Sequence, residues 1–99
     1  EIKVGTAYGS DPNVVLKLLE EVALENKTVH REPQPLALFD GFGESSLNFR
    51  LLVWVSFEDG LVTKSNVAIA VYNKLKEHNI EIPFPQLDLL VKNKEDNNI

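Results

Sequence analysis

The side chains that could do chemistry in this chain are few and scattered. The chain has 99 residues, two histidines and no cysteine. Metal sites and thiol nucleophiles need imidazoles or thiolates gathered at short spacing. His30 and His78 lie far apart in the sequence, and neither has a second ligand at that spacing. We therefore predict no metal site, no cofactor and no disulfide.

Hydroxyl groups next to charged residues are the other candidates for catalysis. Ser10 stands beside Asp11, and Ser45 is followed by Ser46. None of them has a neighbouring base, so we interpret them as helix-cap and turn residues. A phosphate bound at residues 8–11 would be repelled by the Asp11 carboxylate. The sequence therefore predicts that the domain is not an enzyme.

Charge and hydropathy exclude two further classes of function. Fifteen acidic residues against ten basic ones give a formal net charge of -5, which repels nucleic acid. Lysine and arginine do not surround Trp54 densely, so an RNA-stacking surface is not predicted. The longest apolar runs, residues 51–55 and 67–71, fall short of the roughly 20 needed to span a bilayer. Because the chain starts at Glu1, without a methionine or a signal-peptide pattern, we expect that it was cut from a longer protein.

The first half of the chain predicts a strand, a helix and a hairpin. Residues 2–7 alternate with period two, and Ser10-Asp11-Pro12 is typical of a helix start before an amphipathic segment at residues 12–26. A second strand is predicted at residues 36–39, followed by a turn at residues 43–46. Residues 47–57 then alternate. Their predicted core face carries Phe49, Leu51, Val53, Val55 and Phe57.

The second half predicts a helix and a last strand. Apolar spacing indicates a helix at residues 62–78, and Asn79 suits a left-handed cap. The last strand is expected to start at Ile80, to be interrupted by two prolines and to resume at residues 87–91.

The predicted order of strand, helix, strand, strand, helix, strand favours an α+β fold, the ferredoxin-like βαββαβ sandwich. Both helices would cover one face of an antiparallel sheet. The other face would carry Leu52 and Trp54 on the central hairpin, where we expect a contact with another surface. The expected division is a domain at residues 1–86 and a strand with a polar tail at residues 87–99.

The sequence IEIPFPQ at residues 80–86 is the most informative stretch. Its two prolines fix φ, remove amide donors and push Ile82 and Phe84 out of helical space. Together with residues 4–8, Ser10-Asp11 and residues 43–49, it closely resembles the cytoplasmic α/β domain of MscS-like small-conductance mechanosensitive channels.

The resemblance implies a homoheptamer in the bacterial inner membrane, opened by tension during hypo-osmotic shock, with this domain on the cytoplasmic side. Ions and small solutes would pass its vestibule, and the membrane would be reached through helices that this chain lacks. The segment after the prolines would join a parallel barrel of neighbouring copies. The residues expected at subunit interfaces are Leu52, Trp54, Pro83, Phe84, Pro85, Gln86, Leu87, Leu89 and Val91.

A different class of function shares the predicted topology. Small-molecule-sensing domains of the ACT-like kind also use it, and they pair through sheet edges or helices. This alternative requires a ligand cleft at a dimer interface.

Overall fold

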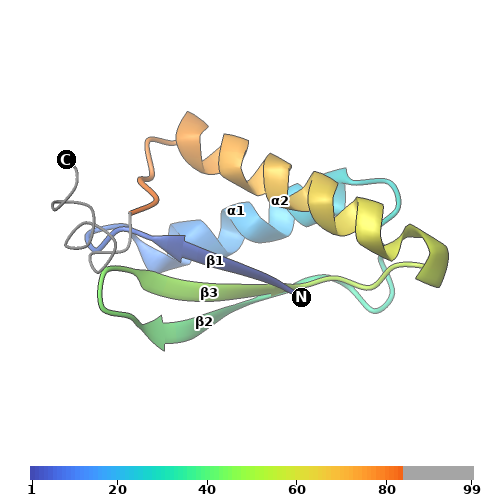
Figure 1. Cartoon of the computed structure of the whole chain (residues 1–99), viewed down its shortest axis with the longest axis horizontal. Helices are drawn as coiled ribbons and strands as arrows, with labels where there is room; N and C mark the ends of the chain where they lie inside the picture. Colours follow the sequence, from blue (N-terminus) through green and yellow to red (C-terminus); the bar gives the residue numbers. More distant parts are fainter. Residues whose placement is uncertain (84–99) are drawn as a thin grey trace, which may run out of the picture.

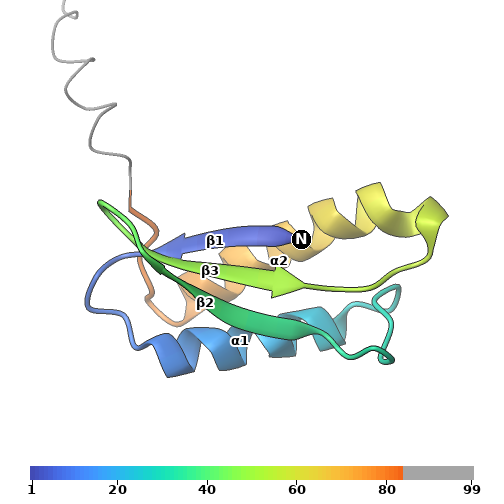
Figure 2. The same cartoon turned by 90° about the horizontal axis from the view of Figure 1, so that it is seen from below.

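The computed structural model describes residues 1–83, which form a sheet with both helices on one face (Figure 1). The elements, in chain order, are β1 (Ile2–Thr6), α1 (Pro12–Glu25), β2 (Leu36–Phe42), β3 (Leu47–Leu52), the short 3-10 helix η1 (Phe57–Asp59) and α2 (Gly60–Glu77). The predicted α+β class is confirmed. Figure 2 shows the sheet from its uncovered face.

The three strands are antiparallel neighbours in the order β1-β3-β2. Val4 stands opposite Phe49 on one side of β3, and Phe39 stands opposite Phe49 on the other. A bulge falls between Phe39 and Gly41, and Gly41 has a φ of 131°, which glycine adopts without the clash of a Cβ. The Gly43 N–H donates to the Ser46 carbonyl at 2.7 Å, which confirms the predicted hairpin connection.

Helix α1 starts where the sequence predicted. Asp11 is the N-cap, and its carboxylate accepts the Asn13 N–H at 3.0 Å, while Pro12 occupies the first helical turn. The helix buries one apolar face against the sheet. That face consists of Val15, Leu18, Leu19, Val22 and Ala23.

Helix α2 begins at Gly60, two positions before the predicted residue 62, and ends at Glu77. Its buried residues follow a four-residue spacing: Thr63, Val67, Val71 and Leu75. The predicted left-handed cap is confirmed, because Asn79 has a φ of 58°. The Ile80 N–H donates to the Leu75 carbonyl at 2.9 Å and the Asn79 N–H to the Lys76 carbonyl at 3.1 Å, as in a Schellman motif.

Strand β3 is shorter than predicted, and one core residue was assigned wrongly. The strand ends at Leu52 because its partners run out: Leu51 pairs with Ile2 at the start of β1, and Leu52 pairs with Leu36 at the start of β2. Val53 and Val55 still pack partly against the core. Phe57, however, lies in η1 and is fully exposed. The period-two pattern therefore continues past the point where the sheet ends.

The predicted fourth strand is not formed within residues 1–83. The described residues after α2 make one backbone hydrogen bond to the first strand's end, from the Ala7 N–H to the Glu81 carbonyl at 2.8 Å. Pro83 has no N–H to extend such a ladder. Strand β2, in contrast, is longer than predicted and reaches Phe42. The strand expected at residues 87–91 lies outside the described residues.

Candidate functional site

The uncovered face of the sheet carries both polar and apolar side chains. Along β3, residues on the core face are buried and the alternating Asn48, Arg50 and Leu52 are half-buried. Leu52 therefore lies on the uncovered face, as predicted. Trp54 follows the end of β3 and is 40% exposed, and its carbonyl accepts the His30 N–H at 2.7 Å. Leu36 stands opposite Leu52 and is 42% exposed, so apolar side chains also lie on this face.

Arg50 lies at the centre of this face, on the middle strand β3. Its guanidinium is close to one carboxylate beside β1 and to another on β2. Its Nη1 donates to the Glu1 carboxylate at 2.9 Å, and its Nε lies 3.6 Å from the Asp40 carboxylate. The hydrogen bond from Arg50 lowers the pKa of Glu1 below its usual value, and the charges of Arg50 and Lys3 act in the same direction. Exposed ion pairs of this kind contribute little to stability.

Removing the guanidinium should raise the pKa of Glu1 in the folded chain. In Arg50→Met, we expect that pKa to return toward the usual glutamate value, because the main hydrogen bond is lost. The sign of the linkage follows: the interaction stabilises the fold above the unfolded pKa and is lost as pH falls through the lowered folded pKa. Titration of the Glu1 side chain by NMR measures this. Lys3→Met should change the pKa less than Arg50→Met; an equal or larger change would contradict the assignment.

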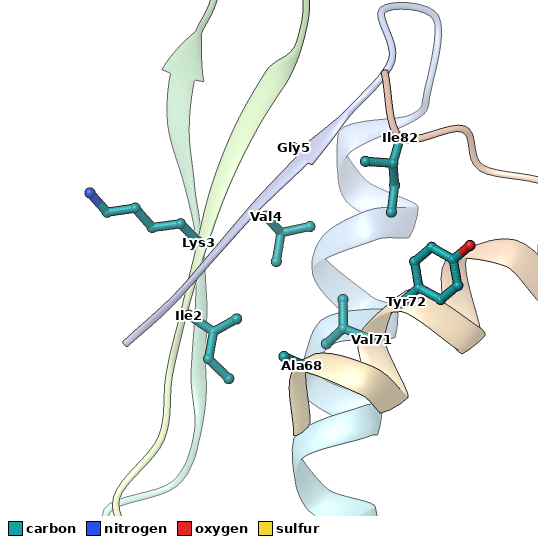
Figure 3. A pocket seen from close by; sticks show the side chains of 8 residues that line it. All are labelled: Ile2, Lys3, Val4, Gly5, Ala68, Val71, Tyr72 and Ile82. Atoms are coloured by element: carbon teal, nitrogen blue, oxygen red, sulfur yellow. The ribbon is translucent and has the colours of Figure 1, made fainter. Parts of the chain in front are cut away.

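A largely apolar groove lies between β1 and α2 (Figure 3). It has a volume of about 160 Å³. Val4 of β1, Val71 of α2 and Ile82 of the exit segment point toward one another across it, with Tyr72 at its rim. Its remaining lining residues are Ile2, Lys3, Gly5 and Ala68. The sequence analysis predicted no groove here, because its lining residues come from three separate segments of the chain.

A second apolar surface lies where η1 meets the start of α2. Phe57 is 100% exposed, Leu61 85% and Val62 65%. Sequence reasoning placed Phe57 in the core, so it missed this surface. The signal that could have found it is Glu58-Asp59-Gly60, which breaks the alternating pattern directly after Phe57.

The described residues show no constellation suited to catalysis. Within residues 1–83, no group of three or more His, Cys, Asp or Glu side chains is placed to hold a metal ion. His78 Nδ1 donates to the Lys74 carbonyl at 3.0 Å at the end of α2. His30 Nε2 lies 3.4 Å from Ser56 Oγ. In this same part of the chain, neither helix has the length and apolarity that a bilayer crossing requires.

Most of the residues predicted at subunit interfaces lie at or beyond the end of the described chain. Pro83 is the last described residue. The remaining predicted residues lie outside the described part: Phe84, Pro85, Gln86, Leu87, Leu89 and Val91.

The three sequence motifs that suggested a channel domain meet at one end of the fold. The loop that connects β1 to α1, the hairpin that connects β2 to β3 and the segment after α2 lie together there (Figures 1 and 2). The sequence as a whole supports the same relationship, because the family described as "Mechanosensitive ion channel MscS, C-terminal" matches residues 1–82. The chain belongs to this family. All the helices and strands given above fall within the matched MscS C-terminal region.

Curated relatives are named as MscS family proteins or as mechanosensitive channels. A Haemophilus influenzae protein named "Uncharacterized MscS family protein" is 41% identical over 95% of this chain, which covers 9% of that protein. A Helicobacter pylori protein named "Small-conductance mechanosensitive channel" is 35% identical over 92% of this chain, 34% of that protein. The Escherichia coli "Mechanosensitive channel MscK" is 34% identical over 95% of this chain, 8% of that protein. The chain thus spans at most about a third of the length of these MscS relatives.

Proposed function

We propose that this chain is a non-catalytic domain of a membrane channel that opens under tension during hypo-osmotic shock. The match of residues 1–82 to the MscS C-terminal family, with relatives named as mechanosensitive channels, carries the proposal. The domain would lie on the cytoplasmic side of a bacterial inner membrane. There it would shape the vestibule that ions and small solutes cross, and it would help seven copies assemble.

The fold supports a structural rather than a catalytic role. Several titratable side chains form surface pairs, such as Lys74 with Glu25 at 3.6 Å, and Asp11 caps a helix. The pKa of Glu1 is lowered mainly by its hydrogen bond with Arg50, which is a surface ion pair. The domain instead has exposed apolar surfaces at the β1–α2 groove and around Phe57. Such surfaces are typical of contacts with other proteins.

The proposal is tested with the full-length protein that carries this domain. Cells that lack their own tension-gated channels should survive a hypo-osmotic downshift when they express it. A matched control replaces the domain by its variant Val67→Asp, whose fold we expect to fail. If the full-length protein reaches the membrane and survival does not exceed that of the control, the proposed function is wrong.

We further propose that residues 1–86 form a ferredoxin-like domain, and that the strand at residues 87–91 leaves it and joins the subunits in a parallel barrel. The division at residue 86 leaves both helices, all three strands and the buried core upstream. Deleting residues 87–99 should therefore leave the thermal unfolding midpoint of the chain nearly unchanged, as measured by circular dichroism. Loss of the cooperative transition after this deletion would show that the tail belongs to the core.

The isolated chain should assemble weakly. It supplies one candidate barrel strand per copy, and a lone strand needs partners for its backbone groups. We expect light scattering to give a mass that rises with concentration. A seven-chain mass that stays the same on dilution would contradict this expectation.

A further inference from the structure

At the end where the chain leaves the domain, one loop is hydrogen-bonded to two other segments. These are the residues after α2 and the hairpin between β2 and β3. The loop consists of residues 7–10, between β1 and α1. The Ala7 N–H donates to the Glu81 carbonyl at 2.8 Å, on the segment that follows α2. The hydroxyl of the next residue, Tyr8, donates to the Gly43 carbonyl at the hairpin between β2 and β3. Two adjacent residues therefore connect the exit of the chain to the hairpin.

The exit segment, residues 79–82, is itself fixed to the body of the domain. Asn79 turns the chain with a φ of 58°, and the Ile80 N–H is bonded to the Leu75 carbonyl at 2.9 Å. Ile82 then points into the β1–α2 groove beside Tyr72 (Figure 3). A helix cap, a backbone bond and an apolar contact hold this segment directly before Pro83.

Hydrogen bonds within the loop at residues 7–10 hold its residues together. The Ala7 carbonyl accepts two hydrogen bonds from Ser10, one from its N–H at 3.2 Å and one from its Oγ at 2.7 Å. Gly9 allows this tight turn, because its φ is 101°. A displacement of Ala7 therefore carries Tyr8 with it.

The hairpin end of the connection is equally tight. Its Gly43 N–H donates to the Ser46 carbonyl at 2.7 Å, so Gly43 is held through both of its backbone polar groups. A Cβ at Gly43 would lie 2.8 Å from Asn48 Nδ2, which shows how closely β3 packs on this turn. Loss of the Tyr8 bond releases one of the two groups.

We propose that residues 79–82 act as a clamp and Tyr8 as a link, so that a displacement of the chain at Pro83 is transmitted through residues 7–10 to the hairpin at residues 43–46. The two states are the clamped one described here and a locally opened one, in which the Ala7–Glu81 bond is broken. Local openings of this kind are part of native-state behaviour and are measured by amide hydrogen exchange. The proposal depends only on these contacts and not on the channel function.

The test loosens the clamp and follows two amides by NMR hydrogen exchange in the whole 99-residue chain. Asn79→Ala removes the short polar side chain that lets asparagine tolerate the left-handed region, so the Ala7 amide should exchange about 5- to 30-fold faster. The Gly43 amide should also exchange faster. Asn79→Gly is the matched control, because glycine keeps this backbone conformation without strain, and it should change both rates less.

Tyr8→Phe tests the link, because it removes one hydroxyl from a half-exposed side chain. In the Tyr8→Phe background, Asn79→Ala should still speed exchange at Ala7 but should no longer affect Gly43. Ile82→Ala, which weakens the clamp without changing the helix cap, should give the same pattern. The proposal is overturned if the Gly43 rate ignores both clamp variants, or if it responds equally with and without the Tyr8 hydroxyl.

Discussion

Replacing Phe49 by alanine is expected to lower the free energy of unfolding by about 3–5 kcal/mol, a large part of the stability of a domain of this size. Phe49 is 1% exposed at the centre of β3, and its ring meets the Phe39 ring edge to face, with centroids 5.4 Å apart. Removing it leaves a cavity in the apolar core on the covered side of the sheet. Equilibrium unfolding in urea, followed by circular dichroism, measures the loss.

Phe57→Ala is the matched control for this prediction. Both phenylalanines belong to the same alternating sequence pattern, but Phe57 is 100% exposed in η1. Its removal should change the free energy of unfolding of the isolated chain by less than about 0.5 kcal/mol. Similar losses for the two variants would mean that β3 continues to residue 57 and that the described end of the sheet is wrong.

Val67→Asp is expected to abolish cooperative folding of the chain at neutral pH. Val67 is fully buried on α2 within the apolar core. A carboxylate there would cost several kcal/mol, because desolvation penalises a charge that has no partner. Acid should relieve part of the loss, since burial raises the pKa of such a carboxyl and the neutral form is favoured at low pH. Circular dichroism melts at neutral and acidic pH measure both effects.

Ile69→Asp is the control for the charge itself. Ile69 lies on the same helix and is 57% exposed, so its carboxylate would remain in water. We expect Ile69→Asp to unfold cooperatively, near the midpoint of the unaltered chain. If Val67→Asp also did so, the helix would have to be rotated relative to the core described here.

The sequence predicted those elements whose periodicity and caps agree. Asp11 and Pro12 defined the start of α1, and Asn79 defined the end of α2, because each of these residues has a local reason to adopt its conformation. The hairpin at residues 43–46 was predicted for the same reason. The alternating run at residues 47–57 predicted too late an end for β3. That end depends on where β1 and β2 start, which is a property of the assembled sheet.

The candidate site was less predictable from the sequence than the fold. Leu52 was placed on the uncovered face correctly, but its expected partner Trp54 follows the strand's end. The polar character of that face comes from Arg50, whose partners Glu1 and Asp40 reach it from β1's start and from the bulge of β2. The groove beside β1 is present where residues 80–83 do not form a fourth strand. Such features arise from tertiary contacts and leave no local pattern.

The motifs that carry the family resemblance contact one another at one end of the fold. Residues 4–11, 43–49 and 80–83 are far apart in the chain, yet the first two are joined at Tyr8 and Gly43, and the first and third at Ala7 and Glu81. Short motifs that contact one another constrain one another's geometry. This end of the domain is therefore where we expect its contribution to the channel to be concentrated.

The most direct test of the account is a recording of current from membrane patches that contain the full-length protein and no other tension-gated channel. Suction on the patch should produce stepwise currents that appear above a threshold tension and disappear when the tension is released. The same protein carrying Val67→Asp should give fewer active channels or none. Patches that contain the intact protein and stay silent up to rupture would contradict the account.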